Sequence, residues 1–272
     1  MKQKMIALLA FVSVFCSVSA QKVNETVTLY GKDQLQGFTI NIDNYSMNLV
    51  ENAMANLFET QYKLKGSKKK GFHVYENQPC FVFGDAKYDI YFTTAEVGKK
   101  KDKTVQVTLV VSTGNMNCIT FSNDPRTSRN IVNFLEKFPK DVEAYKIKLR
   151  IEELENQLTN LKKENESLNK ERAKLEDKIG KTNSEMKSLT ESIDSKSKDI
   201  VAMQEKFNDT HDPLLQEEIA KAVKDKQTME KTYSSDQKSL LNLNNSLVKI
   251  NSKLETNTKK LEETETELKN LK

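Results

Sequence analysis

The fold is decided by residues 147–207, which read IKLRIEELENQLTNLKKENESLNKERAKLEDKIGKTNSEMKSLTESIDSKSKDIVAMQEKF. Apolar side chains recur here with a period of seven at two positions, which together form a seam. They are Ile151, Leu158, Ile179, Met186, Ile193, Ile200 and Phe207 at the first position, and Ile147, Leu154, Leu161, Leu168, Leu175, Leu189 and Met203 at the second. Fourteen of the eighteen seam positions are apolar, and the residues between them are mostly Lys, Glu, Asn and Ser. Disordered chains do not place apolar residues at such regular intervals. The stretch therefore predicts a coiled-coil helix that needs a partner helix.

A polar break at residues 208–213 separates this run from a second one. Within the break, Asp212 followed by Pro213 is a helix start signal. The second run carries Ile219, Tyr233, Leu240, Leu247, Leu254, Leu261 and Leu268 at one seam position, and Leu215, Ala222, Met229, Leu243, Ile250 and Leu271 at the other. The two runs are nearly equal in length, which predicts an antiparallel hairpin with arms at 139–207 and 214–272. A coil formed between two chains is the alternative.

Two asparagines are candidates for setting the register of the hairpin. When Phe207 is paired with Leu215, Asn165 lies opposite Asn257. A buried pair of this kind fixes the alignment of a coiled coil at a cost in stability. A parallel homodimer would instead pair Asn165 with its own copy.

The beginning of the chain has the pattern of a secretory signal peptide at residues 1–20. Lys2 and Lys4 precede an apolar run over residues 5–18. Val18-Ser19-Ala20 then supplies small residues at the positions that a signal peptidase recognises. The chain is therefore expected to cross the cytoplasmic membrane and, in a bacterium, to reach the periplasm or the outside. No later segment is apolar enough to span a bilayer. Cys16 suggests a lipoprotein as the alternative, but Phe15 stands where a small residue is required.

The composition changes near Pro139, because aromatic and β-branched residues precede it and Lys, Glu and Leu dominate after it. Residues 21–138 are therefore expected to form a small globular domain, called the head below. Alternating apolar residues predict strands at 38–42, 88–92 and 105–111, with weaker candidates at 23–30, 72–75 and 80–83. Helices are predicted over 46–62 and from Asp124-Pro125 onward. The fold class is thus α+β, with an antiparallel sheet covered by helices on one face, followed by the long hairpin.

Cys80 and Cys118 are the two cysteines that remain after removal of the signal peptide. In an oxidising compartment they are candidates for a disulfide, and two buried thiols are the alternative. No catalytic, metal-binding or cofactor-binding motif occurs in the chain. A thiol enzyme that uses His73 is conceivable, but no acidic partner is signalled. The sequence therefore predicts a protein that is not an enzyme and has no cofactor.

Two loops of the head are strongly basic. They contain Lys63, Lys65, Lys68, Lys69 and Lys70 in the first, and Lys99, Lys100, Lys101 and Lys103 in the second. Such loops are able to contact an anionic glycan or membrane surface. The alternative is that they are solvent-exposed turns that bind no ligand. The net charge is only +4 and no aromatic residues interleave with these lysines, so nucleic acid is not expected as a partner.

These features predict an interaction protein of the cell envelope, in which the hairpin bridges, spaces or presents a binding tip to a protein partner. Phe207, His211 and Leu214 are the candidate tip contacts. Self-association is also compatible with the seam. The alternative is a ligand-binding head that uses the lysine loops, with the coil as a spacer. The layout resembles, in outline only, periplasmic adaptors with helical hairpins and chaperones with coiled-coil jaws. Neither family's further features are recognisable here.

Overall fold

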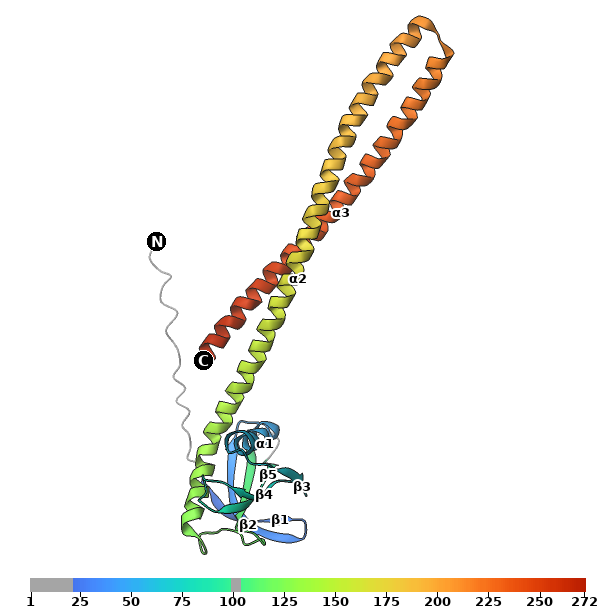
Figure 1. Cartoon of the computed structure of the whole chain (residues 1–272). Helices are drawn as coiled ribbons and strands as arrows, with labels where there is room; N and C mark the ends of the chain where they lie inside the picture. The colour runs from blue at the N-terminus through green and yellow to red at the C-terminus, as the bar shows by residue number, and fades with distance from the viewer. Residues whose placement is uncertain (1–21, 99–103) are drawn as a thin grey trace, which may run out of the picture. The chain divides into compact units, whose positions relative to one another are not determined.

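The computed structural model describes residues 22–98 and 104–272. The chain divides into two compact units with a boundary between Leu149 and Arg150. The first unit contains a sheet and the helices that cover it, and the second is a pair of long helices (Figure 1). The two units are described separately.

The first unit is built on a six-stranded sheet in which every neighbouring pair is antiparallel. The strands are β1 (Asn24–Tyr30), β2 (Asp33–Asp43), β3 (Ser67–Lys69), β4 (Phe72–Pro79), β5 (Lys87–Val97) and β6 (Thr104–Ser112). Their order across the sheet is β1-β2-β6-β5-β4-β3. The longest strands, β2, β5 and β6, are those with the clearest alternation of apolar residues, because one face of each is buried against helices.

One face of the sheet packs against α1 (Met47–Asn56), a π-helical turn η1 (Leu57–Gln61) and the first part of α2 (Pro125–Thr210). Ser46 begins α1 as an N-cap, since its hydroxyl accepts the backbone N–H of Leu49. Phe58 lies at the centre of this core, and its ring contacts Tyr75, Phe83, Phe92 and Phe134, among others. The α+β class with helices on one face is confirmed.

The opposite face of the sheet is covered by the β1–β2 hairpin at one end of the same sheet. The ring of Tyr30 in β1 lies 5.6 Å from that of Phe72 in β4 and 5.2 Å from that of Tyr91 in β5, although β1 is several strands away from both in the sheet order. The β1–β2 hairpin must therefore curl back over β4 and β5. Leu35, Val74, Val110 and Cys118 also belong to this second, smaller core.

Two local features differ from what the sequence predicted. Residues 80–83 form a turn rather than a strand, in which Phe83 N–H donates to Cys80 C=O. The short edge strand β3 was not predicted. Pro139, expected at a boundary, lies inside α2. The apolar pattern continues past this proline, since Phe138 and Val142 are both fully buried in the core of the first unit. Packing there outweighs the intrinsic cost of about 3 kcal/mol for proline in a helix.

The second unit is an antiparallel helical hairpin formed by the rest of α2 and by α3 (Pro213–Leu271). Four ion pairs join the two helices along their length: Arg150 with Glu267, Lys162 with Glu265, Lys272 with Glu155, and Lys196 with Asp225. The break between the helices is shorter than predicted and consists of His211 and Asp212. A hairpin within one chain is therefore the arrangement adopted.

Polar residues interrupt the apolar seam near the open end of the hairpin. Asn257 is only 5% exposed and Thr264 is also buried. Asn165 Oδ1 and Asn257 Nδ2 are a buried acceptor and a buried donor that each lack a hydrogen-bond partner. The structure therefore contains no hydrogen bond between the two amides, and their pairing stays a prediction.

Replacing Asn165 and Asn257 by leucine, singly and together, tests this pairing. Either single change is expected to lower the free energy of unfolding by about 1 to 3 kcal/mol, because it leaves one buried amide against an apolar side chain. The double change is expected to restore or exceed the stability of the original chain, because it makes the seam apolar. Urea unfolding of the four proteins provides the measurement. Simple addition of the two single effects would contradict the pairing.

Candidate functional site

The closed end of the hairpin is shaped by two backbone devices. His211 adopts a left-handed conformation with φ of +49°, and its N–H donates to Phe207 C=O at 2.8 Å, which ends α2. Asp212 then caps α3, because its carboxylate accepts the N–H of Leu214 at 3.0 Å. The chain thus reverses within two residues, and the side chains at this end are held by a defined backbone.

The three predicted tip residues lie in different environments. The rings of Phe207 and His211 are stacked with centroids 6.1 Å apart, and Phe207 is half-buried. Leu214 is 70% exposed on the first turn of α3, and Val201, also exposed, lies on α2 before the turn. The tip therefore carries a strongly exposed apolar side chain, three residues after the exposed imidazole of His211.

The lysines predicted to contact an anionic surface mostly have partners within the head. Lys68 pairs with Glu51, Lys69 pairs with Glu76 at 2.9 Å, and the ammonium group of Lys70 lies 4.3 Å above the ring of Tyr30. The other predicted contacts, Lys99, Lys100, Lys101 and Lys103, lie outside the described residues. Lys68, Lys69 and Lys70 thus contact other residues of the head, which their clustering in the sequence did not reveal.

Glu51 is a carboxylate of the head with partners on three strands. From α1 it accepts hydrogen bonds from Lys68 of β3, from His73 Nε2 of β4 at 2.8 Å and from Thr94 of β5 at 3.4 Å. The His73 ring stacks on Phe92 at 4.5 Å. The hydrogen bonds from Lys68 and His73 hold the pKa of Glu51 below its ordinary value. This cluster ties α1 to three strands, and its atoms are already satisfied by one another.

Cys80 and Cys118 are free thiols in the structure and do not form the disulfide considered from the sequence. Cys80 lies in the core under the helices, whereas Cys118 lies in the second core with Tyr30 and Leu35. Burial raises the pKa of the Cys80 thiol to about 11 and also raises that of Cys118. Neither sulfur is therefore an activated nucleophile at neutral pH.

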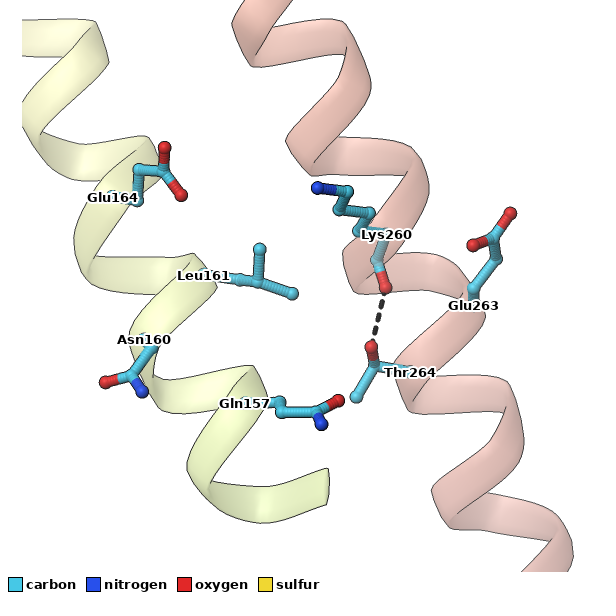
Figure 2. A pocket seen from close by; sticks show the side chains of 7 residues that line it. All are labelled: Gln157, Asn160, Leu161, Glu164, Lys260, Glu263 and Thr264. Atoms are coloured by element: carbon cyan, nitrogen blue, oxygen red, sulfur yellow. Dashed lines mark hydrogen bonds between the residues drawn. The ribbon is translucent and has the colours of Figure 1, made fainter. Parts of the chain in front are cut away.

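An open groove of about 330 Å³ lies between the two helices of the hairpin (Figure 2). Leu161 and Gln157 point from α2 toward α3, and Lys260 and Thr264 point back toward them, whereas Glu263 points away. The Thr264 hydroxyl donates to Lys260 C=O at 2.7 Å. The groove exists because a small polar residue, Thr264, occupies a seam position.

Exposed apolar residues of β1 were missed by the sequence reasoning. Val27 is 58% exposed and Leu29 is 63% exposed. Their signal was present in the sequence, since Val27, Leu29 and Tyr30 place apolar side chains on both faces of one short strand.

The Glu51 cluster predicts a specific pH dependence of stability. A carboxylate whose pKa is lowered by folding stabilises the fold above its ordinary value of 4.5, and this contribution is lost as the pH falls below that value. Glu51→Gln is expected to destabilise the chain by on the order of 1 kcal/mol at neutral pH, and by less in acid. Thermal unfolding across this pH range provides the measurement, and Glu217→Gln on an exposed face of α3 is the matched control. A loss of stability in Glu51→Gln that does not change with pH would contradict a lowered pKa for Glu51.

The two thiols of the chain lacking residues 1–20 are expected to resist iodoacetamide in the native state and to react fully after unfolding, because burial both hides the sulfur atoms and raises their pKa. Mass spectrometry after labelling without a reductant counts the free thiols. Unfolded protein that takes up no label until it is reduced would instead reveal a disulfide.

Three further observations concern the kind of protein this is. Among residues 22–98 and 104–272, no group of three or more His, Cys, Asp or Glu residues is arranged to hold a metal ion. No helix in this described part is both long and apolar enough to cross a membrane. Comparison with protein-family models, with curated proteins and with solved structures found no match, so the chain is assigned to no family.

Proposed function

We propose that this chain is a non-enzymatic interaction protein that uses the closed end of its hairpin to bind a protein partner. The observation that carries the proposal is Leu214, which is 70% exposed and follows the stacked His211 by three residues in the sequence. Val201, Leu241 and Val248 are also exposed on the hairpin, and Leu214 differs from them because it lies on the first helical turn after the chain reversal, where a partner can approach the end of the hairpin.

The proposal places the protein outside the cytoplasm, in the cell envelope or beyond it. Support for export comes from the sequence, where Lys2 and Lys4 precede the apolar run and small residues end at Ala20. These residues lie outside the part that the structure describes. The partner would be met in the compartment to which that signal leads, as expected for a scaffold, an adaptor or a chaperone.

The hydrogen-bonded backbone of the tip also supports the proposal. The N–H of His211 and the carboxylate of Asp212 fix the reversal, so Leu214 is presented without loop ordering. A partner that binds a preorganised apolar side chain loses less conformational entropy in the interface than one that binds a mobile loop.

Site-specific photocrosslinking tests the proposal in the full mature chain. A photoreactive amino acid at position 214 is expected to crosslink a defined partner from envelope extracts, and unlabelled chain should compete for it. The matched control is position 241, where the leucine on α3 is 61% exposed but remote from the turn. The same products from both positions, or none from position 214, would overturn the proposal.

A second readout uses the partner that the crosslink identifies. Leu214→Glu is expected to weaken its binding about tenfold or more, because it places a charge in an apolar contact. Leu241→Glu is expected to leave binding unchanged.

The alternative function, recognition of anionic headgroups by the lysine loops of the head, receives less support. An anionic ligand at Lys68 or Lys69 would meet the nearby negative charge of Glu51 or Glu76. We therefore do not put it forward as the function of the chain.

A further inference from the structure

The two edges of the sheet are built differently. The β3 edge is three residues long and carries Lys68 and Lys69, which is a common way of preventing another strand from adding to a sheet. The β1 edge is seven residues long and contains neither lysine nor proline. Within the described residues, β1 pairs with β2 alone, so its other side presents unpaired backbone groups. The β1 edge therefore lacks the protection that the β3 edge has.

The side chains of β1 add apolar surface to this unprotected edge. Val27 is 58% exposed and Leu29 is 63% exposed, on the face that they share with Gln36 and Gln34 of β2. On the other face, by contrast, Tyr30 is buried in the second core. Two exposed apolar side chains thus flank a row of free backbone donors and acceptors, which is the pattern that favours addition of a strand.

We propose that β1 pairs with β1 of a second copy of this chain, antiparallel, about a twofold axis at Thr28. A twofold axis perpendicular to the sheet keeps the faces of the two strands aligned, so Val27 of each copy lies opposite Leu29 of the other. Thr26 then lies opposite Tyr30 of the other copy on the second face. Both exposed apolar residues of each copy become cross-strand neighbours, and the edge is satisfied on both chains.

Neighbouring registers are less favourable. An axis at Val27 would place Glu25 opposite Leu29 of the other copy, setting a charge against an apolar side chain. An axis at Leu29 would place Val27 opposite Gly31, which has no side chain to cover it. The register centred on Thr28 is the one that pairs both apolar residues.

Charge favours a second copy in the antiparallel direction. Glu25 stands near the beginning of β1, where its carboxylate accepts the N–H of Phe121 at 2.7 Å, and Lys32 lies in the turn after the strand. Antiparallel self-pairing brings the Glu25 end of one strand next to the Lys32 end of the other. Parallel pairing would align like charges at both ends. Glu25 of the strand and Lys32 of the turn that follows it are therefore complementary between two antiparallel copies, as are Val27 and Leu29.

The first test is the mass of the full mature chain in solution, measured by light scattering over a wide range of concentrations. We expect a dimer whose dissociation constant rises about tenfold or more in the Val27→Lys/Leu29→Lys double variant, since like charges would face each other across the interface. Both positions are exposed, so the fold should survive, and circular dichroism checks this. The matched control is Leu241→Lys/Val248→Lys, because these residues are equally exposed on α3.

The second test probes the register. Opposite Cα atoms of an antiparallel pair lie at a separation that a disulfide spans. Thr28→Cys is therefore expected to form a covalent dimer under mild oxidation. Thr26→Cys lies on the same face, but Tyr30 of the other copy lies opposite it. This variant is therefore expected to form no intermolecular disulfide. The unmodified chain, whose two cysteines are buried, gives the background.

Three results would overturn the proposal. The first is a monomer at every concentration, which would leave the edge free or open to a peptide of another protein. The second is a dimer that the control substitutions on α3 dissociate while the β1 substitutions do not, which would place self-association in the coil. The third is crosslinking of Thr26→Cys as efficient as that of Thr28→Cys, which would refute the register.

Discussion

The apolar seam between α2 and α3 is the constraint on which the second unit depends. A helix with an apolar residue at fourteen of eighteen seam positions is not stable alone in water, and the chain supplies the partner helix from its own continuation. The reversal at His211 and Asp212 makes this partner available at little entropic cost. Asn257 and Thr264 weaken the seam near its open end, and the groove beside Leu161 results from the same departure from an apolar pattern.

The head solves a different problem, because a sheet has two faces and the helices cover one. The second face is covered when the β1–β2 hairpin curls back, which buries Tyr30 against Phe72 and Tyr91. The same folding back leaves apolar residues exposed on the outer side of the β1–β2 hairpin. Val27 and Leu29 remain in solvent and β1 remains an edge. The closure of the second core and the exposed apolar edge therefore have one origin.

Periodic features could be predicted from the sequence, and features that depend on tertiary contacts could not. The seven-residue period predicted both helices of the hairpin, and alternation predicted β2, β5 and β6. The run Cys80 to Phe83 was misread as a strand, because four mostly apolar residues also suit a turn that packs into a core. The ion pairs of Lys68 and Lys69 join separate elements, so spacing could not reveal them. The exposure of Leu214 follows from its position at the turn, which the sequence did locate.

The two-residue reversal at His211 and Asp212 also bears on how the hairpin forms in time. Contacts near the turn join residues that are close in the sequence, whereas Arg150 and Glu267 at the other end are 117 positions apart. Closing a short loop loses less entropy than closing a long one. Pairing that begins at the turn can therefore advance residue by residue toward the far end. Changes at the turn should then slow folding, whereas changes at the far end should mainly accelerate unfolding.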